Sequence, residues 1–264
     1  MRAAEIRDAA RLLLDLWDDG EVTDALSPPL RPATRAEGYA VQAALADLAG
    51  GDVVGWKIAA TSAAGQAHIG VDGPLAGRIL RRSVIPDGGS VPAVPNRMAV
   101  AEVEYAFRMG RDLPPRARAY TQDEALDAVA ALHAAIEVPD SRYADFVTAG
   151  APQLIADNAC GHFFVLGTST APDWRDIDLA AHRPTGRVAG KLEREGHGAN
   201  VLGDPRFALT WLVNELSGLG ITLAAGQVVT TGTAVVPMPI APGDEADADL
   251  GRIGTASVRF ARPA

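Results

Sequence analysis

Glycine and proline interrupt this chain so often that few long helices can form in it. The 264 residues include 27 glycines and 18 prolines, above the usual combined share of about 12%. Because both residues favour turns and break regular elements, the pattern indicates many short strands joined by turns. Hydrophobic residues make up 48% of the chain and aromatic residues only 5%, so we expect a mainly aliphatic core.

Two helices are predicted at the N-terminus. Residues 3–18 place apolar side chains on one helical face, and residues 34–49 repeat that pattern. Thr34 and Glu37 stand three residues apart, which is the spacing of a capping box at the start of the second helix. The proline-rich segment 27–32 between the two helices is expected to be an extended connector without helix.

The chain changes character after residue 50. Residues 53–58 read as a strand, and residues 99–108 alternate with the period of two that strands show. A helix is predicted over 121–134, a strand over 135–138 and a further helix over 205–219. Short strands are expected at 227–231, 235–240 and 255–260.

These elements predict an α+β protein with a β-rich centre. We expect an N-terminal helical subdomain over residues 1–50. The β-rich domain over residues 51–264 carries every candidate site residue described below. The sequence contains no internal repeat and no low-complexity segment.

Several classes of protein are disfavoured by charge and composition. The net charge of −9 makes a nucleic-acid backbone an unfavourable partner. No apolar segment approaches the about 20 residues of a membrane span, and charges stand where a signal peptide requires an apolar stretch. We therefore expect a cytoplasmic protein. Cys160 is the only cysteine, which excludes an intrachain disulfide and a cysteine-rich zinc site.

Glu102 and Glu104 are the most informative residues of the sequence. They stand two apart on the strand predicted over 99–108, so both carboxylates project from the same face. Two ionised carboxylates so close together repel unless a cation lies between them, and oxygen ligands suit Mg²⁺ or Mn²⁺. The alternative is a solvated strand face. The apolar neighbours and a third acid, Glu137, on a second predicted strand favour the metal site.

Glu137 admits a second interpretation. His133 precedes it by four residues, and on a helix the two side chains could bind a metal together. That arrangement requires the helix to continue up to Pro139, where the residue before proline is biased away from helix. A histidine near the end of the predicted helix is the preferred interpretation of His133.

Lys57 lies within an otherwise apolar segment. One interpretation is an edge residue whose ammonium reaches solvent along an apolar stem. The other is a desolvated ammonium that binds a substrate carboxylate or transfers protons. Dinucleotide binding is disfavoured because neither the Rossmann nor the P-loop glycine spacing is present.

With these residues identified, the chain resembles the 2-oxopent-4-enoate hydratase and 4-oxalocrotonate decarboxylase group of the fumarylacetoacetate hydrolase superfamily. The matching segments run in order from about residue 35 to the C-terminus. They are Gly55-Trp56-Lys57-Ile58, Ala101-Glu102-Val103-Glu104-Tyr105-Ala106-Phe107, Ala135-Ile136-Glu137-Val138-Pro139-Asp140-Ser141-Arg142, Ala156-Asp157-Asn158-Ala159, Asn200-Val201-Leu202-Gly203-Asp204-Pro205, Thr230-Thr231-Gly232-Thr233 and Pro242-Gly243-Asp244.

The resemblance implies a fold, a site and an assembly. The fold is a mixed, rolled β-sandwich with N-terminal and flanking helices, assembled into homo-oligomers. Mg²⁺ or Mn²⁺ would be bound by Glu102, Glu104 and Glu137, with Lys57 as the catalytic residue. Thr231, Gly232, Leu75 and Asp157 correspond to the substrate-binding positions.

Two positions depart from the pattern of the group. Hydratases of the group carry an aspartate where this chain has Leu75, in Pro74-Leu75-Ala76-Gly77, and a serine where it has Cys160. Both changes shift the expectation away from simple hydration towards decarboxylation or an unfamiliar substrate.

The expected function is that of a metal-dependent lyase acting on a small 2-oxo acid or 2-hydroxy-dienoic acid. Hydratase and decarboxylase activity are both open. A carbon–carbon hydrolase of the fumarylpyruvate or acylpyruvate type ranks below them. The rival from another class is a non-catalytic homologue that binds metal or carboxylates and has lost the acidic counterpart of Leu75.

Overall fold

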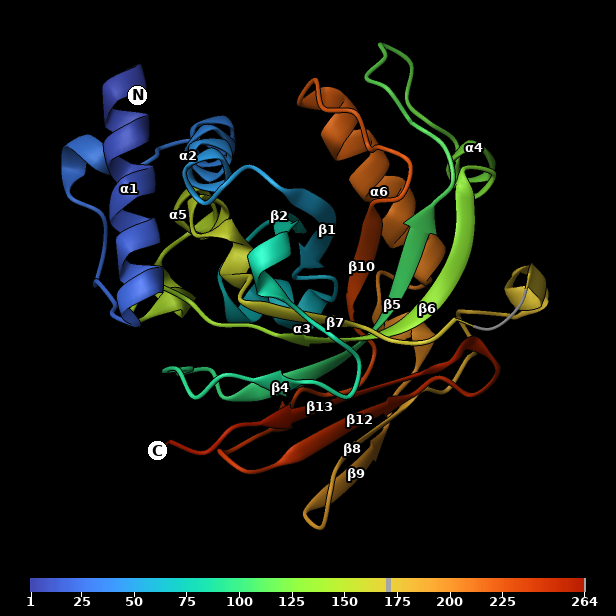
Figure 1. Cartoon of the computed structure of the whole chain (residues 1–264). Helices are drawn as coiled ribbons and strands as arrows, with labels where there is room; N and C mark the ends of the chain where they lie inside the picture. The colour runs from blue at the N-terminus through green and yellow to red at the C-terminus, as the bar shows by residue number, and fades with distance from the viewer. Residues whose placement is uncertain (170–171, 264) are drawn as a thin grey trace.

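The computed structural model describes residues 1–169 and 172–263, which form two sheets flanked by helices (Figure 1). The helices are α1 (Ala3–Asp19), α2 (Arg35–Leu48), α3 (Ala63–His68), α4 (Gln122–Leu126), α5 (Ala151–Ala156) and α6 (Pro205–Gly218). Short 3-10 turns are η1 (Pro28–Leu30), η2 (Arg81–Ser83), η3 (Phe146–Thr148), η4 (Asn158–Cys160), η5 (Pro172–Asp176), η6 (Gly198–Asn200) and η7 (Gly251–Ile253).

The described residues place the strands in a larger, strongly curled sheet and a smaller one. The larger sheet has the order β2-β1-β10-β5-β6-β7-β3, with β11 paired to β5, and the smaller has the order β4-β13-β12-β8-β9. The strands are β1 (Val53–Ala59), β2 (Leu75–Leu80), β3 (Val84–Ile85), β4 (Ser90–Val91), β5 (Val100–Met109), β6 (Val129–Val138), β7 (Phe163–Leu166), β8 (Thr185–Val188), β9 (Leu192–Glu195), β10 (Val228–Thr233), β11 (Met238–Pro239), β12 (Glu245–Asp249) and β13 (Thr255–Phe260).

The connection between β2 and β3 explains the curvature of the larger sheet. These strands lie at opposite ends of the strand order, yet only the three residues of η2 separate them in the chain. The sheet must therefore curl until its two ends approach each other. It is also mixed, because β1 pairs with β10 in parallel while β5 and β6 pair antiparallel. These observations confirm the prediction of an α+β protein with a β-rich centre.

The main core lies between the two sheets and under α6. The alternation of β5 directs Val103 and Tyr105 into this core, while Glu102 and Glu104 point to the opposite face. Val258 of the smaller sheet and Leu212 of α6 pack into the same cluster. The opposite face of the larger sheet carries the candidate site and a smaller apolar cluster of its own.

The two predicted N-terminal helices are confirmed. In α1 the buried side chains Ala9, Ala10, Leu13 and Leu14 follow helical spacing, and in α2 the Thr34 hydroxyl accepts a hydrogen bond from the Glu37 amide in a capping box. Their apolar cluster also contains residues beyond residue 50, namely Leu80, Tyr143 and Ala156. The division into domains at residue 50 remains a proposal.

The predicted helix over 121–134 is wrong in its second half. Helix α4 ends at Leu126, and the chain enters β6 at Val129. The run of alanines favours a helix locally, but pairing of β6 with β5 along its length overrides that propensity. His133 is therefore a mid-strand residue opposite Ala106. The alternative of a helical metal site shared by His133 and Glu137 is excluded.

Other expectations need smaller corrections. The connector 27–32 contains the 3-10 turn η1 (Pro28–Leu30), because proline is compatible with the first turn of a helix. The strand expected over 235–240 is reduced to the two residues of β11. The helix expected over 205–219 is present as α6, with Asp204 capping its first turn.

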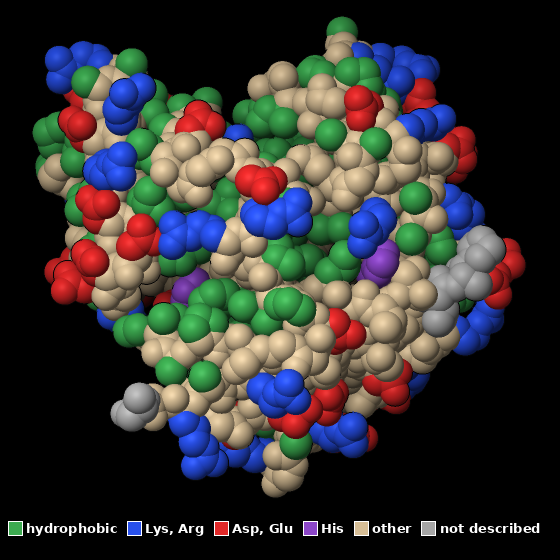
Figure 2. Space-filling view, viewed as in Figure 1, with side chains coloured by type: hydrophobic (Ala, Val, Ile, Leu, Met, Phe, Trp, Pro, Cys, Tyr) green, Lys and Arg blue, Asp and Glu red, His purple; other side chains and the backbone are tan. Residues whose placement is uncertain are grey.

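On the face shown in Figure 2, acidic and basic side chains are interspersed instead of being gathered by sign. None of the helices in residues 1–169 and 172–263 combines the length and apolar character needed to cross a membrane.

Candidate metal and lysine site

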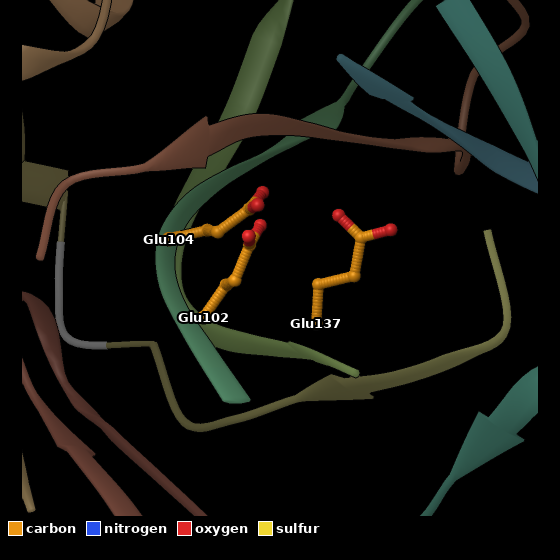
Figure 3. A group of neighbouring side chains, drawn as sticks. All are labelled: Glu102, Glu104 and Glu137. Atoms are coloured by element: carbon orange, nitrogen blue, oxygen red, sulfur yellow. The ribbon is translucent and has the colours of Figure 1, made fainter. Parts of the chain in front are cut away.

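Three glutamates converge on one face of the curled sheet (Figure 3). Glu102 and Glu104 share a face of β5, and Glu102 stands directly opposite Glu137 of β6. Directly opposed side chains of antiparallel strands are close neighbours. One oxygen from each carboxylate lies within 4.8 Å of the others. The structure therefore brings together the three residues that the sequence selected.

Glu104 is held through one oxygen only. Its Oε2 accepts hydrogen bonds from the Thr230 hydroxyl and from the Gly232 amide, the latter at 2.9 Å. Its Oε1 is buried and has no hydrogen-bond partner among the described residues. A buried carboxylate oxygen without a donor is unfavourable, so this atom is available to a cation.

Glu137 shows the same division between its two oxygens. Its Oε1 lies 2.9 Å from the Lys57 Nζ, whereas its Oε2 is buried without a partner in the described part of the chain. Two buried carboxylate oxygens thus lie unpaired in one cluster. Such a set of oxygen donors fits a hard divalent cation such as Mg²⁺ or Mn²⁺.

The electrostatics of the cluster agree with this fit. Burial, reinforced by the negative charge of Glu137, raises the pKa of Glu102 to about 7. Burial and the charges of Glu137 and Glu102 raise the pKa of Glu104 well above its ordinary value. A divalent cation would favour the ionised forms of all three side chains.

Lys57 is a buried ammonium that lies beside this cluster. It is only 4% exposed, and its Nζ donates a hydrogen bond to the Ala159 carbonyl at 2.6 Å. Burial alone lowers the pKa of Lys57, but the negative charges around it, led by Glu137, raise it overall. The interpretation of Lys57 as an edge residue whose ammonium reaches solvent is wrong, because its ammonium lies inside the protein.

Gly77 makes room for the Lys57 side chain. It stands opposite Lys57 in the pairing of β2 with β1. A Cβ at this position would lie 2.9 Å from the Lys57 Cδ and 2.5 Å from the Asn158 carbonyl oxygen. The absence of a side chain at Gly77 therefore permits the close approach of the lysine and of the turn that contains Asn158.

Thr231 and Gly232 lie at the bulged end of β10 next to Glu104. The Thr231 Oγ1 is buried without a hydrogen-bond partner among residues 1–169 and 172–263. Gly232 has a φ of 88°, and a Cβ there would lie 2.1 Å from the Thr61 Oγ1. The backbone here requires glycine, both for its conformation and for its contact with Thr61.

Leu75 and Asp157 are both completely buried. Leu75 pairs with Ala59 at the start of β2, two residues before Gly77, so it projects from the face of the sheet that carries Lys57. Asp157 accepts a hydrogen bond from the Ser141 hydroxyl at 2.6 Å and forms an ion pair with Arg142. Its carboxylate is thus engaged by the chain itself.

A small pocket adjoins the Lys57–Glu137 pair. Its walls include Ile79 of β2, Phe164 of β7 and His162, so it lies where the two ends of the curled sheet approach each other. The sequence did not indicate this pocket, since its walls come from elements far apart in the chain. It also did not indicate Thr230 or the Ala159 carbonyl. Thr230 could have been inferred from its place beside Thr231, whereas a backbone carbonyl carries no sequence signal.

Comparison with known proteins places this site in a family. Residues 78–261 match the model of the fumarylacetoacetate hydrolase C-terminal family. The chain belongs to this family. The match includes the three glutamates and Gly232, while Lys57 and Leu75 precede it.

Relatives of the chain include both hydratases and a decarboxylase. A 2-keto-4-pentenoate hydratase of Burkholderia vietnamiensis is 39% identical over 203 residues, which cover 76% of each chain. A 4-oxalocrotonate decarboxylase of Pseudomonas sp. strain CF600 is 30% identical over 250 residues, covering 94% of this chain and 92% of the relative.

A solved structure agrees with the fold over nearly the whole chain. The 4-oxalocrotonate decarboxylase of Pseudomonas putida G7, complexed with magnesium and adipate, has a TM-score of 0.87 and 25% sequence identity, and 98% of each chain is covered. The helices, the curled sheet and the smaller sheet of this family member therefore have counterparts in an enzyme that binds a divalent cation.

Proposed function

We propose that the protein is a divalent-metal-dependent lyase acting on a small 2-oxo acid or 2-hydroxy-dienoic acid, as a hydratase or a decarboxylase. One observation carries the proposal: two buried, unpaired carboxylate oxygens of Glu104 and Glu137 lie in a three-glutamate cluster beside a buried lysine. The names of the relatives, 2-keto-4-pentenoate hydratase and 4-oxalocrotonate decarboxylase, support it.

Glu102, Glu104 and Glu137 would hold Mg²⁺ or Mn²⁺. When bound, the cation supplies a positive charge that polarises the carboxylate and 2-oxo oxygens of the substrate. The hydrogen bonds from Thr230 and Gly232 fix the orientation of Glu104. Lys57 fixes Glu137 in the same way. The chain thus orients two of the three ligands before any substrate enters.

Lys57 would move protons during the reaction. In hydration, a dienol loses a proton from oxygen and gains one on carbon before water adds to the conjugated enone. In decarboxylation, carbon dioxide leaves and the carbon chain takes up a proton. Either sequence needs a positioned acid and base beside the substrate, and Lys57 is the buried ammonium in contact with the cluster.

The remaining residues would shape the substrate site. The unpartnered Thr231 hydroxyl can bind a substrate oxygen, and Gly232 leaves space beside it. Leu75 adds apolar surface on the Lys57 side of β2. The Asp157 carboxylate binds Arg142 and Ser141. We therefore propose that Asp157 stabilises the backbone next to the site and does not contact the substrate.

Three finer features also remain proposals. The fold is proposed to be a mixed rolled β-sandwich, supported by the curvature of the larger sheet and the smaller sheet packed against it. The protein is proposed to act as a homo-oligomer, which light scattering on the purified chain would test. A cytoplasmic location is proposed from the sequence and would be tested by cell fractionation.

The test of the proposed function is turnover. Purified protein should convert a 2-hydroxy-dienoic acid or an unsaturated 2-oxo diacid when Mg²⁺ or Mn²⁺ is present and should lose activity in a chelator. Turnover of neither substrate class with either metal would contradict the proposal. Hydrolysis of an acylpyruvate alone would favour a carbon–carbon hydrolase, and metal binding without turnover would favour a non-catalytic protein.

A further inference from the structure

The turn η4 contains an unusual run of backbone conformations. Asn158, Ala159 and Cys160 have φ values of 54°, 52° and 60°, so three consecutive residues other than glycine adopt the left-handed region. Asparagine adopts this region more readily than most residues, but alanine and cysteine do so only at a cost. Such strain persists where the surrounding structure holds it, and it is concentrated at functional sites.

The side chain of Asn158 is one element that holds the turn. Its Oδ1 accepts a hydrogen bond from the Arg78 amide at 2.7 Å, and its Nδ2 donates one to the Arg78 carbonyl at 2.8 Å. The amide group therefore pairs with β2 as a neighbouring strand would. Asn158 is only 2% exposed, and Gly77 beside Arg78 leaves room for its carbonyl.

Both ends of the turn are anchored as well. Asp157, just before it, is paired with Arg142 and Ser141. The Cys160 carbonyl accepts a hydrogen bond from the Asp140 amide at 2.9 Å. With these contacts the position of the middle residue, Ala159, is fixed on both sides.

The turn presents the Ala159 carbonyl to the Lys57 ammonium, at 2.6 Å. Among residues 1–169 and 172–263, the second acceptor of this ammonium is the Glu137 Oε1, at 2.9 Å. An ammonium group has three N–H donors, so these two contacts fix its position and leave one donor to be directed at a substrate. Without the carbonyl, Glu137 would be the remaining anchor, and the ammonium could turn about that single contact.

We infer that Asn158 is a positioning residue that acts through Lys57: by joining the left-handed turn to β2, it places the Ala159 carbonyl that orients the lysine ammonium. The inference rests on the proposed function for its kinetic consequence. No hydrogen bond joins the Asn158 side chain to the three glutamates or to Lys57; its hydrogen bonds go to the Arg78 backbone.

We call the two hydrogen bonds between the Asn158 side chain and the Arg78 backbone the Asn158 clamp. The chain offers a matched control for it. Asn214 of α6 makes the same pair of contacts with one backbone unit, accepting from the Tyr120 amide at 2.7 Å and donating to the Tyr120 carbonyl at 3.0 Å. This second clamp joins α6 to the segment before α4, away from the glutamate cluster. Asn214→Ala removes this pair and a third hydrogen bond, which the Asn214 Nδ2 donates to the Thr210 carbonyl at 3.0 Å. It is therefore at least as severe a loss as Asn158→Ala, but only the Asn158 clamp adjoins Lys57.

The experiment compares Asn158→Ala, Asn158→Gly and Asn214→Ala in the full chain with saturating Mn²⁺. Both Asn158 variants should lower kcat by about 10- to 100-fold, the scale expected when a reacting group is misplaced, with KM and the Kd for Mn²⁺ within about twofold of wild type. Asn214→Ala should lower Tm without changing kcat. Asn158→Gly keeps the left-handed backbone conformation accessible, so it provides the test if Asn158→Ala does not fold.

A double variant tests whether Asn158 acts through Lys57. In the Lys57→Ala background, Asn158→Gly should cause no further loss of kcat, because the group that it positions is gone. Additive losses would overturn the inference. An unchanged kcat in folded Asn158→Gly would also overturn it, and would assign Asn158 to stability alone.

A chemical readout separates this inference from the proposed function. In wild type, Lys57 should react slowly with acetic anhydride, as measured by peptide mass spectrometry, and Asn158→Gly should raise that rate several-fold while Asn214→Ala does not. If wild type turns over no 2-oxo acid, the proposed function fails, but the acetylation rates still test whether Asn158 positions Lys57. Equal Lys57 reactivity in all three proteins would overturn the inference that Asn158 positions Lys57.

Discussion

The Lys57 Nζ lies 2.9 Å from the Glu137 Oε1, although two strands, β10 and β5, separate their strands in the sheet. At a strand spacing of about 4.8 Å, a flat sheet would hold β1 and β6 about 14 Å apart. The contact is possible because the sheet is curled and both long side chains project from the same face. The curvature of the sheet thus joins the proposed metal ligands to the proposed proton-transfer group.

Glu102→Gln and Glu104→Gln should each abolish metal-dependent turnover while the protein remains folded, because each change removes a charged oxygen ligand and preserves side-chain volume. The Kd for Mn²⁺, measured by calorimetry, should rise together with the loss of kcat. Glu193→Gln, at an exposed position of β9, is the control and should behave as wild type. Normal activity and metal affinity in both site variants would contradict the assignment of ligands.

Lys57→Ala should lower kcat by at least ~100-fold, the usual scale for a positioned acid or base. Steady-state kinetics with saturating Mn²⁺ and a separate measurement of metal affinity would distinguish this effect from damage to Glu137, which loses its ion-pair partner in the variant. A change confined to KM would show that Lys57 binds substrate without transferring protons.

Leu75→Asp should shift the reaction from decarboxylation towards hydration. An apolar pocket favours loss of a carboxylate, since desolvation disfavours the charged ground state relative to a transition state with delocalised charge. We therefore expect wild type to decarboxylate a 2-oxo-hexenedioate-type diacid better than it hydrates 2-hydroxypentadienoate. Carbon dioxide release and loss of dienol absorbance should be followed for both substrates with Mn²⁺.

Leu75→Asn is the matched control for Leu75→Asp, because it introduces similar volume and polarity without the carboxylate. Leu75 is completely buried, so the Tm of both variants must be compared with that of wild type. Efficient hydration by wild type that neither variant alters would show that position 75 does not select the reaction.

His162 should lower the stability of the protein as the pH decreases below about 6.5. Burial, with the charges of Arg142 and Arg82, lowers its pKa from 6.5 to about 3. Between these values the unfolded chain binds a proton that the folded protein does not, so the free energy of unfolding decreases as the pH falls through this window. Above the window this contribution is constant.

His162→Gln should therefore flatten the dependence of Tm on pH between about pH 4 and 6.5. Thermal unfolding of wild type and variant would be measured across this range and at pH 7.5. His68→Gln, at an exposed position of α3, is the control. If the wild-type and His162→Gln curves stay parallel throughout, His162 does not contribute to acid sensitivity.

The three acids of the site could be identified from the sequence because strand geometry relates neighbouring positions directly. Alternation along 99–108 is sufficient to place Glu102 and Glu104 on one face, and the segment around Glu137 read as a strand as well. The N-terminal helices could be predicted equally well, because the capping box of Thr34 and Glu37 and the apolar spacing in α1 are local signals.

The start of β6 was decided by tertiary structure. The alanine-rich segment from Val129 onwards satisfies helical propensity, and only pairing with β5 selects the strand. Local sequence carries no information about which neighbour will supply those backbone hydrogen bonds, so the helix predicted over 121–134 extended too far.

The sequence by itself determined which side chains could bind a cation and where the chain must turn, because these properties belong to residue types and to spacings of a few positions. Tertiary structure alone decided that Lys57 meets Glu137 and the Ala159 carbonyl. The first contact depends on closure of the curled sheet. The second depends on a strained turn held by Asn158, whose partner is the backbone of Arg78. Backbone groups are the same at every residue, so only the folded chain specifies which of them reaches the lysine.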